Sequence, residues 1–62
     1  MLVKLNGKHE VAAEEHNIFD FLLARYLNPL RLKIECNGRL LDHKDWPTVN
    51  LRDGDTITVI AA

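Results

Sequence analysis

The sequence is poor in cysteine, and none of its apolar runs is long. The single cysteine, Cys36, cannot form an internal disulfide, which fits a reducing compartment. Apolar runs such as residues 21–24 are far too short to cross a bilayer. No basic segment followed by an apolar one opens the chain, so we expect no secretory signal. These absences predict a cytoplasmic protein that does not bind membranes.

The chain also lacks an excess of charge of either sign. Eight basic and nine acidic residues give a net charge of −1, and the lysines and arginines are scattered along the chain. Binding to nucleic acid requires a basic face or stripe, so we expect no nucleic-acid partner. The length of 62 residues predicts one small domain over residues 1–62, with little stability to spare.

Recognisable catalytic and metal-binding motifs are missing as well. No Ser-His-Asp set, paired carboxylates or glycine-rich phosphate loop is present, and Cys36 with His43 supplies only two zinc ligands. Cys36 shares strand parity with Ile34, so we interpret it as a core residue rather than a sulfur-relay thiol. A chain this short leaves few residues for the walls of a substrate pocket, which favours a carrier or binding module over an enzyme.

An apolar content of 47% is enough for a core, and local signals divide it into elements. Asn6-Gly7 predicts a hairpin, because both positions accept a positive φ, and Asn37-Gly38 predicts another. Asn17 is the expected N-cap of a helix over residues 18–27, which Asn28-Pro29 would end. The expected strands are residues 2–5, 8–11, 30–36, 39–41 and 56–60.

This order predicts an α+β fold of two layers, with one helix packed across one face of a mixed four- to five-stranded sheet. The first and last strands are expected side by side at the centre of the sheet. Trp46, in a loop over residues 42–48, should cover one end of the core. In the last turn, Asp53 and Asp55 are expected to cap the backbone amides of the turn itself, with Gly54 at a positive φ.

Five motifs follow one another along the chain: Leu5-Asn6-Gly7, Asn17-Ile18 leading to Leu22-Leu23, Leu32-Lys33-Ile34-Glu35-Cys36-Asn37-Gly38, Asp45-Trp46, and Leu51-Arg52-Asp53-Gly54-Asp55-Thr56-Ile57. In this order they resemble the ThiS family of sulfur carriers in thiamine biosynthesis, which have a ubiquitin-like β-grasp fold. The similarity covers nearly the whole chain, residues 3–61.

The resemblance implies a carrier that is not itself an enzyme and binds no cofactor. In this family a ThiF-like adenylating enzyme activates the C-terminal glycine with ATP, the terminus becomes a thiocarboxylate, and a ThiG-like thiazole synthase receives the sulfur. Glycine suits a tail that must thread a narrow channel in an extended form, since a side chain would clash with the walls.

The end of this chain departs from that pattern, because Ala61-Ala62 stands where the family leads toward Gly-Gly. Judged by the spacing from Asp55, the two alanines match the end of the last strand and form the base of the tail. We therefore expect the diglycine to lie beyond these 62 residues. The alternatives are that Ala61-Ala62 replaces Gly-Gly, or that the protein has lost carrier activity.

The open face of the sheet is the expected docking surface. Parity predicts that it shows Lys4, Lys8, Glu10, Arg31, Lys33, Glu35, Thr56 and Thr58, with Leu2 and Ile60 as apolar islands. The resemblance implies Leu2, Leu40 and Ile60 as apolar anchors, with Arg39 and Lys33 supplying charge.

Phe19, Leu23 and Leu27 widen the apolar arc of the helix beyond what one sheet covers. This fits either deep burial or contact of Phe19 and Leu23 with a partner or in a weak homodimer. A β-grasp interaction or regulatory module without carrier activity is therefore the alternative function. A carrier for another sulfur pathway, of the molybdopterin type, is a further one.

Overall fold

Two Asn-Gly turns organise the sheet of this protein. The computed structural model describes the backbone of residues 1–61 and the side chains of residues 1–60. Asn6 and Asn37 have φ values of 52° and 55°, and the glycine after each has a φ of 83°, as a two-residue hairpin turn requires. The elements in chain order are β1 (Leu2–Leu5), β2 (Lys8–Val11), α1 (Ile18–Leu23), η1 (Pro29–Arg31), β3 (Lys33–Cys36), β4 (Arg39–Leu41), η2 (His43–Thr48) and β5 (Thr56–Ala61), where η marks a 3-10 helix.

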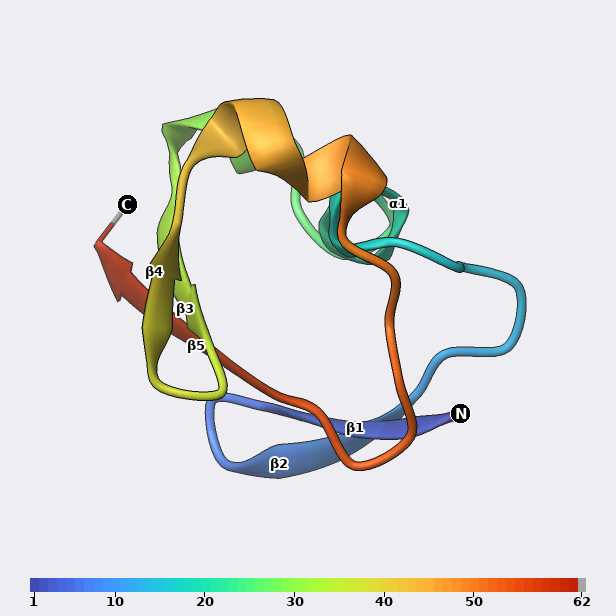
Figure 1. Cartoon of the computed structure of the whole chain (residues 1–62). Coiled ribbons are helices and arrows are strands. Elements are labelled where there is room, and N and C mark those ends of the chain that lie inside the picture. The colour runs from blue at the N-terminus through green and yellow to red at the C-terminus, as the bar shows by residue number, and fades with distance from the viewer. Residues whose placement is uncertain (62) are drawn as a thin grey trace.

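The five strands form one mixed sheet in the order β2-β1-β5-β3-β4. β5 lies at its centre, parallel to β1 and antiparallel to β3, and the two hairpins form the flanks. Figure 1 shows α1 and η2 together on one side of the sheet. The predicted α+β architecture, with adjacent first and last strands, is confirmed.

The core fills the space between the sheet and the layer of α1 and η2. Trp46 is fully buried, which confirms its predicted place. α1 begins where predicted, because Asn17 Oδ1 accepts a hydrogen bond of 2.8 Å from the Asp20 N–H. The largest buried side chains are Val3, Ile18, Phe21, Leu22, Ile34, Trp46 and Ile57.

The predicted extent of the helix, residues 18–27, is wrong, since α1 ends at Leu23. A continuing helix would use the Phe21 carbonyl to accept the Arg25 N–H. Instead the Arg25 guanidinium donates to that carbonyl at 3.0 Å, and the Arg25 N–H donates to Leu22 O. Leu22 O accepts both the Arg25 N–H at 3.0 Å and the Tyr26 N–H at 2.9 Å, so the helical ladder closes on this one carbonyl.

The predicted start of the third strand is also wrong. Pro29 begins η1, in which the N–H groups of Arg31 and Leu32 donate to the carbonyls of Asn28 and Pro29. Leu30 is consequently half exposed, and β3 begins only at Lys33.

Lys8 and Glu10, assigned by parity to the open face, and Arg39, expected among its docking residues, lie on the helix side instead. Arg31, also assigned to that face, lies in η1 and not in a strand. Lys8 pairs directly with Leu5, and Glu10 pairs with the buried Val3. Arg39 likewise pairs with Cys36. Directly opposed residues in an antiparallel pair share a face, so all three face the α1–η2 layer.

Candidate functional site

The resemblance to ThiS-like carriers implies that the working group follows the last strand, so the end of β5 is the candidate site. β1 pairs with β5 only at Lys4–Thr56 and Leu5–Ile57, whereas β3 follows β5 to the Lys33–Ala61 pair. The last residues of β5 therefore run past the β1–β2 hairpin. Figure 1 shows them leaving the sheet at the outer edge of the molecule, far from the N-terminus. A chain that continued from Ala61 would have an outward path.

Two turn asparagines hold β5 from its two sides. Asn6 Oδ1 accepts a hydrogen bond of 2.8 Å from the Val59 N–H, and the Asn6 N–H donates to Ile57 O at 2.9 Å. On the other side, Asn37 Oδ1 accepts the Thr56 N–H at 2.9 Å, and the Asn37 N–H donates to Thr56 O at 2.8 Å. Each turn asparagine thus pairs with the central strand β5 much as a strand residue would, because its backbone N–H donates to β5 and its side-chain oxygen accepts from β5.

A β-bulge marks the exit of β5. Ile34 pairs with Val59, but Lys33 pairs with Ala61, so Ile60 has no residue directly opposite it on β3. Such an extra residue bends and twists the strand that carries it. The Ile60 side chain is about half exposed at this point.

Only part of the predicted docking set gathers at this exit. Lys33 and Leu40 line a shallow cavity of about 370 Å³ with Leu41, Asp42 and His43. Lys33 pairs with Ala61, so this cavity lies beside the end of β5. Leu40 and Ile60 remain exposed apolar side chains, as expected. We call Lys33, Leu40 and Ile60 the exit surface.

The other predicted partner residues lie elsewhere. Leu2 pairs with Val11 at the opposite end of the sheet, and both side chains are exposed. Along the strand register Leu2 lies six residues, or about 20 Å, from Ile60. Arg39 faces away from the exit surface, on the helix side. Ala61 is the last residue of β5, and Ala62 lies outside the described residues.

On the helix layer, Phe19 is partly buried against the core, which removes it from an exposed patch. Leu23 is half exposed. Leu27, expected with Phe19 and Leu23 in the widened apolar arc, is fully exposed, because α1 ends early. Leu30, expected in the third strand, is half exposed, because η1 turns it outward.

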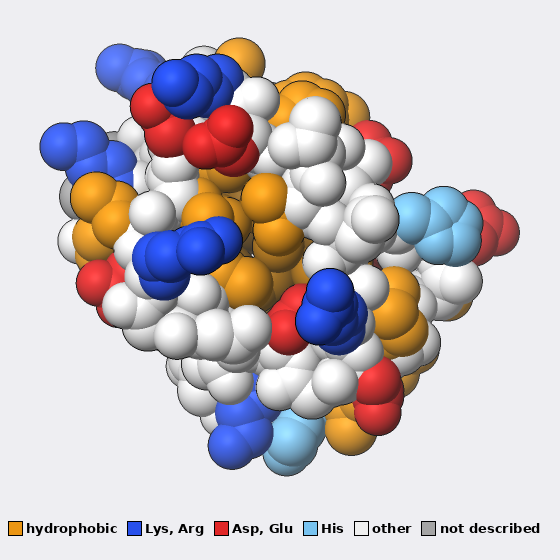
Figure 2. Space-filling model, in the orientation of Figure 1, with side chains coloured by type: hydrophobic (Ala, Val, Ile, Leu, Met, Phe, Trp, Pro, Cys, Tyr) orange, Lys and Arg blue, Asp and Glu red, His pale blue; other side chains and the backbone are white. Residues whose placement is uncertain are grey.

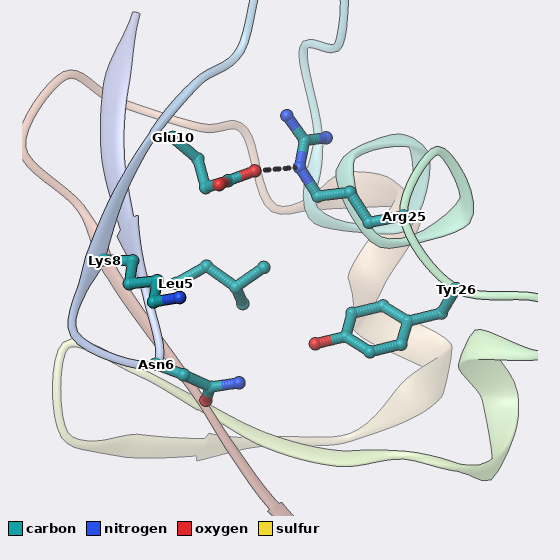
Figure 3. Close-up of a pocket in the computed structure, with 6 residues that line it drawn as sticks. All are labelled: Leu5, Asn6, Lys8, Glu10, Arg25 and Tyr26. Carbon is teal, nitrogen blue, oxygen red and sulfur yellow. Dashed lines mark hydrogen bonds and ion pairs between the residues drawn. The ribbon is translucent and has the colours of Figure 1, made fainter.

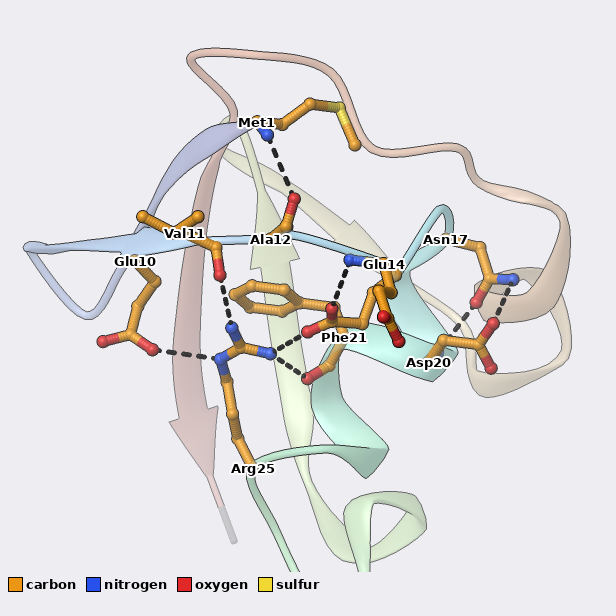
Figure 4. A network of polar contacts seen from close by, with 10 residues as sticks. Met1, Glu10, Val11, Ala12, Glu14, Asn17, Asp20, Phe21 and Arg25 are labelled. Carbon is orange, nitrogen blue, oxygen red and sulfur yellow. Dashed lines mark hydrogen bonds and ion pairs between the residues drawn. The ribbon is translucent and has the colours of Figure 1, made fainter.

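A cluster around Arg25 joins β2, the β2–α1 link and α1 (Figure 4). The guanidinium contacts Glu10 at 3.0 Å and Glu15 at 2.6 Å, and donates to Val11 O at 3.1 Å. It also stacks over the Phe21 ring, 3.9 Å from the centroid. The sequence analysis missed this cluster, because the two carboxylates that pair with Arg25 lie ten and fifteen residues away along the chain and form no local pattern with it.

The cluster fixes the charge states of its members. The hydrogen bond from Arg25 lowers the pKa of Glu15 to about 2. Burial alone would lower the pKa of Arg25, but hydrogen bonds to Glu15 and Glu10 outweigh it and raise that pKa. Both groups are therefore charged at neutral pH.

A cavity of about 380 Å³ lies beside this cluster (Figure 3). Its lining includes Leu5, Asn6, Lys8, Glu10, Arg25 and Tyr26. The Glu10–Arg25 ion pair crosses its upper part, so the guanidinium is already neutralised by carboxylates. This arrangement holds the hairpin to α1 and leaves the arginine unavailable for an anionic ligand.

The thiol of Cys36 is poorly suited to chemistry. Cys36 is half buried, and desolvation, followed by the nearby Asp55 carboxylate, raises the pKa of its thiol. A thiol rather than a thiolate is the main form at neutral pH, which makes it a weak nucleophile. The interpretation of Cys36 as a packing residue agrees with this environment.

Residues 1–61 contain neither a metal-binding group nor a membrane-spanning helix. No three His, Cys, Asp or Glu side chains in this range form a group that could hold a metal ion. Within the same range, no helix has the length and apolar character needed to cross a membrane.

Solved structures resemble this chain, whereas sequence comparisons find no relative. No protein-family model matches the sequence, and no similar sequence is found among curated proteins. The crystal structure of the thiamine biosynthesis protein ThiS from Geobacter metallireducens is similar, with a TM-score of 0.85 over all of this chain and 94% of that chain, at 22% sequence identity. At this identity the likeness concerns the fold. The protein therefore has the ubiquitin-like β-grasp fold of ThiS.

Proposed function

We propose that the protein is a sulfur carrier of the ThiS type, which acts as a co-substrate and not as an enzyme. The observation that carries the proposal is the position of β5, the central strand of a ThiS-like fold, whose end runs outward past the β1–β2 hairpin. A reactive carboxylate beyond such a strand can reach into another protein while the scaffold stays folded. We propose that this carboxylate lies on a diglycine extension beyond residue 62. We also propose that the protein is cytoplasmic.

The chemistry needs no group from the folded domain. A partner of the ThiF type would bind ATP and transfer AMP to the carboxylate, releasing pyrophosphate. Sulfide would then displace AMP, so that one carboxylate oxygen is exchanged for sulfur. A ThiG-like thiazole synthase would consume the thiocarboxylate. Cys36, with its raised pKa, takes no part.

The exit surface is the proposed docking site for these partners. Leu40 and Ile60 are exposed apolar side chains near the end of β5, and Lys33 adds a positive charge between them. Exposed apolar side chains with a polar surround are typical of protein interfaces. Leu2 and Arg39 lie too far from this surface, or on the wrong face, to join the same contact.

The test compares two forms of the chain, one extended by Gly-Gly and one by Ala-Ala. Each is incubated with a ThiF-like adenylating enzyme, ATP and sulfide, and its intact mass is measured. We expect the diglycine form alone to gain the mass of an oxygen-to-sulfur exchange, in an ATP-dependent way. The 62-residue chain should compete with it for the enzyme. No mass change in the diglycine form, together with no competition, would refute the proposal.

One observation favours a second candidate, a β-grasp interaction module. Leu23, Leu27 and Leu30 expose apolar surface at the end of α1 and in the segment that follows it. A weak homodimer through these leucines would be seen as a concentration-dependent mass in sedimentation, abolished by Leu27→Asp. If the protein remained a monomer at all concentrations, these leucines would not form a homodimer interface.

A further inference from the structure

A larger cavity, of about 580 Å³, opens on the helix side of the sheet. It lies between the β3–β4 hairpin and the segment that joins η2 to β5. In Figure 2 a hollow near the middle of this face has hydrophobic side chains at its floor and Lys or Arg side chains at its sides. Cys36, Leu41 and Val49 supply apolar lining. The size falls within the range of small-molecule sites.

Two arginines line this cavity from its two walls. Arg39 comes from β4, and Arg52 from the segment that precedes β5. Both are exposed, and neither makes an ion pair with any described residue, since the ion pairs of the described chain both belong to Arg25. Each guanidinium therefore keeps its full set of donors for a ligand.

The one carboxylate in the cavity does not occupy these donors. Asp55 is buried, and its Oδ1 accepts a hydrogen bond of 3.0 Å from Asn37 Nδ2. Its Oδ2 accepts the backbone N–H of Arg52 at 2.8 Å, so it contacts the backbone of that residue and not its guanidinium. With two positive groups and one negative, the lining keeps a net positive charge.

We propose that this cavity, the Arg39–Arg52 cleft, binds a small molecule that carries a phosphate or carboxylate group. A planar guanidinium forms paired hydrogen bonds with the oxygens of such an anion, and two of them on opposite walls can hold it from both sides. Asn50 and Thr48 add uncharged polar groups to the lining. None of the lining residues is aromatic, so the cleft offers no stacking surface for a nucleobase. The inference does not depend on the sulfur-carrier proposal.

The floor of the cleft is compatible with an anion. Burial, and then the Asp55 carboxylate, raises the pKa of Cys36, so its thiol stays protonated and uncharged at neutral pH. A thiolate in this place would repel the ligand. The positive charge of Arg39 lowers the pKa of the Cys36 thiol and so opposes this rise in part. This agrees with the position of Arg39 in the lining of the same cleft.

The test is an NMR titration of the 62-residue chain at constant ionic strength. The probes are inorganic phosphate and pyrophosphate in one arm, and succinate and citrate in the other. We expect saturable shifts centred on the amides of Cys36, Arg39 and Asn50. The arm that saturates identifies phosphate or carboxylate as the source of the anion.

Matched variants decide whether the cleft is responsible. Arg39→Gln and Arg52→Gln should each weaken binding about tenfold, because each removes charge-assisted hydrogen bonds. Arg31→Gln removes the same charge from an exposed arginine of η1 and should leave binding unchanged. Shifts that do not saturate in either arm, or an equal loss in the Arg31 variant, would overturn the proposal.

Alkylation of Cys36 gives a second readout that needs no variant. A bound anion should cover the thiol and slow its reaction with iodoacetamide, to an extent that follows the NMR saturation curve. Binding without any protection of Cys36 would place the ligand outside the cleft and would also overturn the proposal.

Discussion

The side chain of Asn6 offers a sharp test of how β5 is held near its exit. Asn6→Gly keeps the positive φ of the turn and the N–H bond to Ile57 O, but it removes the oxygen that accepts the Val59 N–H at 2.8 Å. A hydrogen bond of this kind contributes about 0.5–1.5 kcal/mol. Its loss should speed exchange of the Val59 amide with solvent deuterium by about two- to tenfold beyond any global change.

Asn37→Gly is the matched reciprocal variant. It removes the acceptor of the Thr56 N–H, so exchange should accelerate at Thr56 and not at Val59. Amide exchange of both residues in both variants, followed by NMR, separates local release from global destabilisation. If both amides changed by the same factor in both variants, each asparagine would affect only overall stability, and the reasoning about the exit would be refuted.

Three further outcomes are expected. Arg25→Met should lower the free energy of unfolding by about 1–3 kcal/mol, because it removes contacts to both carboxylates and two carbonyls. In urea unfolding the exposed control Arg31→Met should change it by less than about 0.5 kcal/mol, and equal effects would argue against the Arg25 cluster. The pKa of Glu15 lies at about 2 in the folded protein against its usual 4.5, so its stabilisation should be complete above pH 4.5 and fade as the pH falls toward 2. The Tm difference between the protein and Glu15→Gln should shrink over that window, and a constant difference would contradict the assignment. Leu40→Asp and Ile60→Asp should each weaken binding to an adenylating partner about tenfold, whereas Leu23→Asp, on the helix layer, should not. The reverse pattern in a binding titration would favour the interaction-module alternative.

Features set by neighbouring residues were predictable from the sequence. The two Asn-Gly turns, the Asn17 cap and the buried Trp46 all follow from local chemistry, and the structure contains each of them. Only one of the two turn caps expected around Gly54 exists: Asp55 accepts the N–H of Arg52 within the turn, whereas Asp53 accepts the N–H of Leu2, 51 residues away along the chain.

Features set by distant contacts were not predictable in the same way. The end of α1 depends on the Arg25 guanidinium, whose position is fixed by carboxylates ten and fifteen residues away. Periodicity alone could not show that interaction.

The sequence did contain the signal for the sheet face on which Lys8, Glu10 and Arg39 lie. A two-residue turn makes its flanking residues direct partners, so the Asn6-Gly7 turn already implied that Lys8 shares a face with Leu5. The same rule places Arg39 with Cys36. The signal was present in the sequence, and the parity of the return strands was misassigned.

The position of the carried sulfur distinguishes a C-terminal thiocarboxylate from sulfur held on a cysteine. The diglycine-extended chain and its Cys36→Ser variant would be charged with sulfur by an adenylating enzyme and ATP, then fragmented in a mass spectrometer. We expect the same mass change in both, confined to the C-terminal glycine. Sulfur bound to the Cys36 side chain, and absent from the serine variant, would contradict this expectation.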